Sequence, residues 1–300
     1  MSISHYIKEI GRGRDGARAL DRAQAADLMG HILDGHVSDL ELGAFCIAMR
    51  IKGETDQEMA GFLDAAHARL QPIIAPPPVV VLPSYNGARK LPVLTPLLAH
   101  LLSREGLAVV VHGTPTESIR VTSQDVLTAM GTASLSQPRA VNAGEVVFVP
   151  TEVLCPGLKR LLDVRCVVGL RNPAHSLVKL MNPTTAADAL LVSSYTHPEY
   201  AISMAATFEL TGARALLLRG TEGEVVADVR RTPQMAAFVR GTRTALVEAQ
   251  AGSLIKLPEL PTDIDATSTA RYTQAVLQGE LPVPAPLAAQ VQAVLKALSL

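Results

Sequence analysis

The chain changes character at Ala75–Leu82, where it reads APPPVVVL. Three successive prolines cannot continue a helix, because each of them lacks a backbone N–H donor. The valines that follow are β-branched and begin a run that is typical of a buried strand. We therefore expect a hinge here, with one domain at residues 1–74 and a second at residues 75–300.

The residues before the hinge show the pattern of helices only. Asp21 is placed to cap a helix whose apolar residues recur on one face. Ser38 with Glu41, and Thr55 with Glu58, form two capping-box pairs, and an apolar run follows each pair. This part of the chain is therefore predicted to be a compact helical domain.

After the hinge, short β-rich runs alternate with helical stretches. Such alternation predicts a parallel sheet covered by helices, with ligands beyond the carboxyl ends of its strands. Part of residues 171–190 is expected to pack with the helical domain, and the tail at 257–286 to be loop with short elements. The five expected strands are residues 79–82, 107–111, 146–149, 189–192 and 215–218.

The composition excludes several classes of protein. The chain has 27 Lys+Arg against 28 Asp+Glu, which excludes a uniformly basic protein but not local basic patches. Aromatic residues make up only 3%, which disfavours a single-strand binder built on rows of stacked bases. No apolar run reaches roughly 18 residues, so we expect no membrane partner. The N-terminus lacks an apolar signal core and no C-x-x-C pair is present, so the cytoplasm is the expected location.

Two loops at predicted strand ends carry side chains that suit ions. Ser84–Lys90, SYNGARK, combines a glycine with two adjacent cations and suits phosphate, with a solvated turn as the alternative. Residues 220–224, GTEGE, could hold Mg²⁺ through two carboxylates, although such turns are more often only solvated. A lone histidine at a strand end, as at His112, is more often structural than catalytic. No P-loop and no G-x-S-x-G elbow is present, so we predict no catalytic residue and no metal ligand.

Basic residues gather in three places. From Cys155 to Lys179 there are five basic residues against the single acid Asp163. Residues 214–243 contain six arginines against three acids, and four arginines lie within residues 12–22. Such patches attract polyphosphate backbones and release counterions, while solvated surface charge is the alternative for each patch.

Several motifs resemble those of anthranilate phosphoribosyltransferases. Residues 50–55, RIKGET, resemble the R-x-K-G-E-T signature of that family, and residues 111–113, VHG, resemble its K-H-G strand end. Arg171 followed by Asn182-Pro183 resembles its G-x-R … N-P segment. The resemblance covers nearly the whole chain. It implies a small N-terminal helical domain and a large parallel-sheet α/β domain of the nucleoside phosphorylase and phosphoribosyltransferase type.

The catalytic motifs depart from that family. The family binds the diphosphate of phosphoribosyl pyrophosphate on a G-T-G-G-D loop, where this chain has SYNGARK, and its Asp-Glu metal pair aligns here with Val225-Val226. A magnesium diphosphate site without its acidic ligands should bind poorly, so we expect no cofactor and no anthranilate phosphoribosyltransferase activity. The resemblance leaves a remnant substrate cleft, in which Arg171 matches an arginine that contacts anthranilate in the family. Its residues are Tyr85, Asn86, Gly87, His112 and Arg171.

These departures resemble the YbiB-type branch of the family. The stretches that carry this resemblance are SYNGARK, RNPAHSL at 171–177 and RGTEGE at 219–224. The resemblance implies a homodimer, joined through its N-terminal helices, that binds DNA or RNA backbones without strong sequence preference. The residues that it implies for the binding groove are Lys159, Arg160, Arg165, Arg89, Lys90 and Lys179.

Our leading hypothesis is therefore non-specific nucleic-acid binding by a homodimer with a transferase fold. The alternative is an enzyme, a phosphoribosyltransferase or other glycosyltransferase with an altered substrate, which would use Mg²⁺ with phosphoribosyl pyrophosphate. A third reading is a sensor in which a small molecule in the old cleft regulates nucleic-acid affinity.

Overall fold

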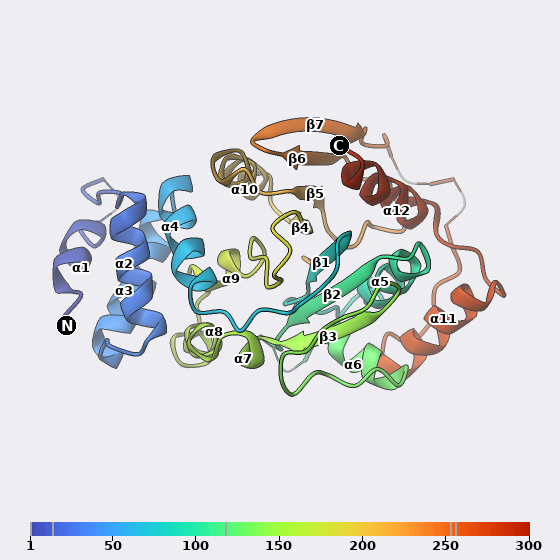
Figure 1. Ribbon diagram of the computed structural model, residues 1–300, viewed down its shortest axis with the longest axis horizontal. Coiled ribbons are helices and arrows are strands. Elements are labelled where there is room, and N and C mark those ends of the chain that lie inside the picture. The colour runs from blue at the N-terminus through green and yellow to red at the C-terminus, as the bar shows by residue number, and fades with distance from the viewer. Residues whose placement is uncertain (1, 14, 118, 253, 256) are drawn as a thin grey trace. The chain divides into compact units, whose positions relative to one another are not determined.

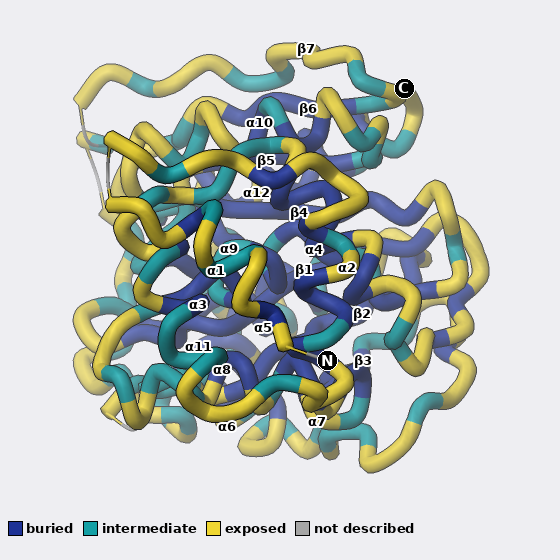
Figure 2. The backbone as a smooth tube through the Cα atoms, turned by 90° about the vertical axis from the view of Figure 1, so that its left-hand side faces the viewer, coloured by how far each residue is buried: buried dark blue, intermediate teal, exposed yellow. Residues whose placement is uncertain are grey.

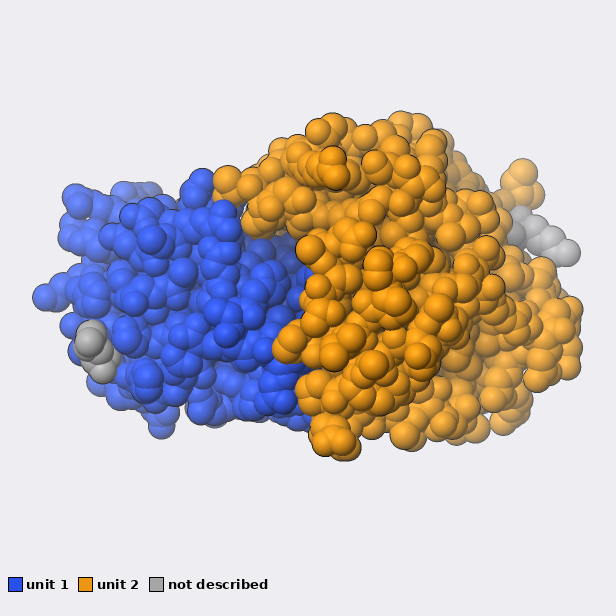
Figure 3. Space-filling model, in the orientation of Figure 1, with its two compact units in different colours: residues 1–71, 151–183 blue, residues 72–150, 184–300 orange. Residues whose placement is uncertain are grey.

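The chain forms two compact units. The computed structural model describes residues 2–13, 15–117, 119–252, 254–255 and 257–300 (Figure 1). The helical unit comprises Met1–Gln71 and Thr151–Pro183, and the sheet unit comprises Pro72–Pro150 and Thr184–Leu300 (Figure 3). The chain first passes from the helical unit to the sheet unit between Gln71 and Pro72, close to the predicted hinge. The helical unit also contains residues 151–183, of which we expected only part of 171–190 to pack with the helical domain.

The helical unit is built from two separate parts of the chain. In it α2 packs mainly on α4, α8 packs on α2, and α9 packs on α4. Its core contains Phe45 and Phe62, whose rings meet edge to face at 6.2 Å. The helices are α1 (Ser4–Ile10), α2 (Arg22–Leu33), α3 (Asp39–Lys52), α4 (Asp56–His67), α7 (Thr151–Leu154), α8 (Pro156–Val168) and α9 (Ala174–Leu177).

Capping boxes begin three of these helices, where the sequence predicts two boxes and a cap at Asp21. Asp21, Ser38 and Thr55 each accept a hydrogen bond from a backbone N–H in the first turn of α2, α3 and α4. The box of α4 is also buried. Its Glu58 is fully buried, and the carboxylate lies 2.6 Å from the ammonium group of Lys52. The RIKGET signature therefore helps to fix the junction of α3 with α4.

The sheet unit contains one seven-stranded sheet in the order β3-β2-β1-β4-β5-β6-β7. The five predicted strands are present and parallel, but β6 and β7 add an antiparallel hairpin that the sequence reading did not include. The sheet is therefore mixed. The strands are β1 (Val79–Pro83), β2 (Ala108–Gly113), β3 (Val146–Pro150), β4 (Leu190–Tyr195), β5 (Ala215–Arg219), β6 (Met235–Val239) and β7 (Thr242–Val247).

Burial explains the strand pattern. The central strands β1, β2 and β4 are buried almost throughout, which is why they read as continuous apolar runs, whereas β7 is an exposed edge (Figure 2). One core cluster joins the strands with the helices α5 and α12, which also contact each other. The helices of this unit are α5 (Thr95–Arg104), α6 (Ser123–Ala129), α10 (Pro198–Thr211), α11 (Ala266–Gln278) and α12 (Ala285–Leu298).

The tail at 257–286 holds a longer helix than the short elements that we expected there. α11 begins after Asp265, whose carboxylate accepts hydrogen bonds from two backbone N–H groups of its first turn. Cys155 separates α7 from α8, which starts with Pro156, a residue suited to the first helical position. In the described residues no helix is long and apolar enough to cross a membrane.

Candidate functional site

The loop after β1 is folded around a buried carboxylate from the loop after β5. Glu224 is only 1% exposed, and its Oε1 accepts hydrogen bonds from the backbone N–H groups of Asn86, at 2.9 Å, and Gly87, at 2.8 Å. Gly87 has a φ of +62°, and a Cβ there would lie 2.6 Å from the carbonyl oxygen of Val121. Two adjacent N–H groups aimed at one oxygen form a nest of the kind that binds anions.

Hydroxyl groups surround the second oxygen of this carboxylate. Thr95 at the start of α5 donates to Oε2 of Glu224 at 3.0 Å, and the Ser84 hydroxyl donates to the same atom. The Ser123 hydroxyl lies 3.4 Å from it. The sequence singled out the loop that contains Ser84 but offered no signal for Thr95 and Ser123, because serine and threonine are common residues.

A second carboxylate lies on the next part of the same loop. The Glu222 carboxylate accepts hydrogen bonds from the backbone N–H groups of Arg89, Lys90 and Leu91, at 3.3, 3.0 and 3.0 Å. Its Oε2 is also 3.7 Å from the guanidinium group of Arg120. Both carboxylates of GTEGE are thus surrounded by hydrogen-bond donors, which repel a metal ion. The arrangement opposes the Mg²⁺ interpretation of this turn.

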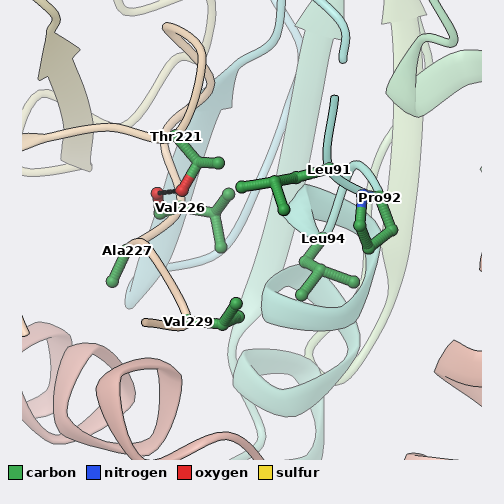
Figure 4. A pocket seen from close by; sticks show the side chains of 7 residues that line it. All are labelled: Leu91, Pro92, Leu94, Thr221, Val226, Ala227 and Val229. Carbon is green, nitrogen blue, oxygen red and sulfur yellow. Dashed lines mark hydrogen bonds between the residues drawn. The ribbon is translucent and has the colours of Figure 1, made fainter. Parts of the chain in front are cut away.

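Apolar side chains close the remaining space between the two loops (Figure 4). The volume left there is about 10 Å³, which leaves room for one water molecule at most. This pocket therefore cannot hold a substrate. Its lining residues are Leu91, Pro92, Leu94, Thr221, Val226, Ala227 and Val229.

Four of the five predicted cleft residues come together in the sheet unit. Asn86 and Gly87 bind Glu224 as described, and the Tyr85 hydroxyl lies 2.9 Å from Nδ1 of His112. His112 is fully buried, and burial lowers its pKa to about 3, so the imidazole is neutral. Its position in the core of β2 fits the structural role that a lone histidine usually has. The fifth residue, Arg171, belongs to the helical unit.

The predicted nucleic-acid residues are divided between the two units. Lys159, Arg160, Arg165 and Lys179 belong to the helical unit. Arg89 and Lys90 belong to the sheet unit, where their side chains are exposed, and the structure describes no ion pair for either of them.

Two basic residues of α8 are held by local contacts. Lys159 forms an ion pair with Asp163 one turn later, so the single acid of this segment balances a charge that we had counted toward the patch. Arg160 is exposed, donates to the carbonyl oxygen of Leu33 at 2.9 Å and covers Gly35.

Three other cations gather around His175. Burial, and after it the positive charges of Arg171, Arg165 and Lys179, lower the pKa of His175 to about 4. Burial is the largest cause of this shift, and the three positive charges add to it in the same direction. The three cations belong to one segment of the sequence, but only the folded structure shows that all three act on the same imidazole.

The other two basic groups of the sequence are largely engaged in structural contacts. Near the N-terminus Arg12 and Arg18 pair with Glu9, and Arg22 pairs with Asp64. Arg14 lies outside the described residues. In the region 214–243, Arg214 donates to carbonyl groups at the end of α12, Arg230 pairs with Asp228, and Arg243 lies over the ring of Phe238.

Comparison with known proteins identifies relatives of this chain by sequence. Residues 4–69 match the family described as glycosyl transferase family, helical bundle domain. The chain is 43% identical over 300 residues to the Escherichia coli protein named Uncharacterized protein YbiB, with 97% of this chain and 92% of that protein covered. It is 26% identical over 272 residues to the anthranilate phosphoribosyltransferase of Methylobacterium radiotolerans, with 88% and 78% covered.

Solved structures share the fold. Anthranilate phosphoribosyltransferase from Thermus thermophilus superposes with a TM-score of 0.73 at 24% identity, covering 95% of this chain and 85% of that one. The Saccharomyces cerevisiae enzyme, in complex with phosphoribosyl pyrophosphate and Mg, gives a TM-score of 0.69 at 15% identity, covering 99% and 88%. At these identities the likeness concerns the fold.

Proposed function

Because the chain belongs to the anthranilate phosphoribosyltransferase-like family, we propose that it uses this fold to bind the phosphate backbone of nucleic acids as a homodimer. The observation that carries the proposal is the excess of basic residues between Cys155 and Lys179, three of which, Arg165, Arg171 and Lys179, act on His175. The imidazole is neutral at physiological pH, and guanidinium and ammonium groups attract phosphates with little regard to base sequence. The exposed cations Arg89 and Lys90 add positive charge to the sheet unit.

The dimer is supported by an apolar surface on α3. Leu40, Ile47 and Ile51 are 85%, 37% and 57% exposed and recur at helical spacing on one side of this helix. An exposed apolar stripe of this kind is typical of an association surface. It lies on the N-terminal helices, where we expect dimerisation.

The enzyme alternative has weaker support. A phosphoribosyltransferase with an altered substrate needs its phosphate loop open to a ligand, whereas here two carboxylates of the chain occupy the backbone N–H groups of that loop. Calorimetry with phosphoribosyl pyrophosphate and Mg²⁺ is expected to give no saturable heat. Saturable binding with turnover would favour the enzyme instead.

The test of nucleic-acid binding is a titration of fluorescent DNA and RNA at several salt concentrations. We expect log affinity to fall linearly with log salt, with a slope of about −0.9 per phosphate contact on duplex DNA. Arg165→Glu and Lys179→Glu should weaken binding to all sequences alike and reduce the magnitude of the slope.

The matched control is Arg243→Glu, which changes the net charge equally but lies on the exposed edge strand β7. Its binding should remain near that of the wild type, and thermal unfolding of each variant checks that it is folded. Binding that does not respond to salt, or an equal loss in Arg243→Glu, would contradict the proposal.

A further inference from the structure

We propose that a cavity along one face of α11 is a binding site for a small molecule with both charges, an α-amino acid with an apolar side chain. The cavity has a volume of about 320 Å³, at the lower end of the roughly 300–1,000 Å³ that is usual for small-ligand pockets. It lies within the sheet unit and includes none of the residues discussed for nucleic acids or for the substrate cleft. The inference is therefore independent of both.

One wall of the cavity is a single face of α11. Ser268, Arg271, Tyr272 and Ala275 line it, and their spacing of three or four residues places them along one side of a helix. Tyr272 is only 7% exposed, and burial raises the pKa of its hydroxyl. This wall therefore combines one cation with neutral polar and apolar groups.

The chain segments before and after α11 form the other walls. Residues 261–263 precede the helix and Leu281 follows it. The first segment leads into the Asp265 cap, which accepts hydrogen bonds from two backbone N–H groups of the helix. The N–H of Leu281 donates to the carbonyl oxygen of Ala275 at 3.4 Å, and its side chain packs against the core of the sheet unit. Walls that are fixed before a ligand arrives reduce the entropy cost of binding.

The walls carry one charge of each sign. Asp263 before the helix and Arg271 on the helix are both exposed and line the same cavity. Within the part of the chain that the structure describes, the two are not paired with each other, and neither side chain forms another ion pair or hydrogen bond. A guanidinium group binds a carboxylate through two parallel hydrogen bonds, and a carboxylate attracts an ammonium group. The two charges therefore suit a ligand that carries a carboxylate and an ammonium group close together.

Apolar side chains complete the cavity. Pro261, Ala275 and Leu281 come from the segment before the helix, from the helix and from the segment after it. Apolar ligand surface that is buried against them adds to the affinity. The three kinds of wall group thus match the three parts of an apolar α-amino acid, whereas a ligand with a single charge leaves Asp263 or Arg271 without a partner.

The experiment is calorimetry of the full-length protein with free leucine, isoleucine, valine, methionine and phenylalanine. We expect saturable binding of at least one of them, with a rise in melting temperature, because a ligand that binds only the native state stabilises it. The oxo acid and the amine that correspond to the best ligand each lack one charge and should bind at least about tenfold more weakly. No saturable binding of any of the five up to about 10 mM would overturn the proposal.

Two variants assign the charges to the two side chains. Asp263→Asn should weaken binding of the amino acid at least about tenfold and leave the affinity for the oxo acid unchanged, because only the ammonium group loses its partner. Arg271→Gln should weaken binding of both compounds. Since both side chains are exposed and make no described contact, each variant should melt like the wild type when no ligand is present.

The matched control is Arg104→Gln on α5, which removes the same charge from an exposed residue outside the cavity. Its affinity for the amino acid should equal that of the wild type. Unchanged binding in Asp263→Asn and Arg271→Gln, or an equal loss in Arg104→Gln, would overturn the proposal.

Discussion

Folding removes the carboxylate of Glu224 from water, and neutral hydrogen-bond donors of the protein take the place of that water. A hydrogen bond to a charged group contributes roughly 1.5–3 kcal/mol, more than one between neutral groups. The bonds that Glu224 makes with Asn86, Gly87 and Thr95 therefore tie together the loops after β1 and β5 and the start of α5. The Ser84 hydroxyl and the backbone N–H groups of Asn86 and Gly87 in the SYNGARK loop are thus organised around this one carboxylate.

Two histidines, the fully buried His112 and the partly buried His175, are neutral for different reasons. Burial alone lowers the pKa of His112 to about 3. For His175 the positive charges of Arg171, Arg165 and Lys179 act in addition to burial, and its pKa is about 4. Of these two pKa values, only that of His175 therefore depends on the three cations.

The first prediction concerns the pH dependence of stability. His175 takes up a proton near pH 6.5 in the unfolded chain but only near pH 4 in the native one, so stability falls as the pH drops between these values. His175→Gln should reduce the loss between pH 7 and pH 5 by about 1 to 2 kcal/mol, measured by urea unfolding at both pH values. The exposed His197, changed to Gln, is the control and should leave the loss unchanged. An unaltered loss in His175→Gln would show that the imidazole is not held neutral.

At the scale of elements, side chains close to each helix start decide where it begins. The Ser38 hydroxyl accepts from the backbone N–H of Glu41, and the Glu41 carboxylate accepts in turn from the N–H of Ser38. The same carboxylate accepts from the hydroxyl of Ser2, so this cap also holds the segment before α1. These hydrogen bonds lower the pKa of Glu41 to about 2.

The second prediction follows from this cap. Ser38→Ala removes the acceptor for the N–H of Glu41 and should lower the free energy of unfolding by about 1 kcal/mol, as measured by urea unfolding followed by circular dichroism. Ser38→Asp restores an acceptor at the same position and should retain most of the stability. Equal losses in both variants would mean that the cap contributes little.

At the scale of the whole molecule, the two units contribute different residues to the function that we propose. The helical unit carries the apolar stripe of α3 and the cations around His175. The sheet unit carries the loops that Glu222 and Glu224 close. The helical unit therefore contributes most of the proposed contacts with partners.

The third prediction concerns assembly. Leu40→Glu combined with Ile51→Glu places charges on the stripe of α3, and the mass found by sedimentation should fall to that of one chain, because burying these charges in an interface is costly. The control is Ile202→Glu on α10, a residue that is 74% exposed in the sheet unit, and it should stay dimeric. A wild type that already sediments as a monomer, or a double variant that remains dimeric, would contradict dimerisation through α3.

The sequence by itself determined the elements whose signals are local. The capping boxes lie within four residues, and the buried strands are unbroken apolar runs, so α2, α3, α4 and β1 to β5 could be predicted. The hairpin of β6 and β7 was missed because its turn has positive φ at both Arg240 and Gly241, and arginine is not a residue that signals such a turn.

Only the tertiary structure decided what the candidate site contains. Glu224 meets Asn86 across 138 positions of the chain, and a contact of this length leaves no periodic pattern in the sequence. Arg165 and Lys179 come near His175 through the packing of α8 on α9, which spacing alone did not reveal. Local hydrogen bonds and apolar runs depend on residues that are close together in the sequence, whereas the partners of a buried charge depend on how distant segments fold together.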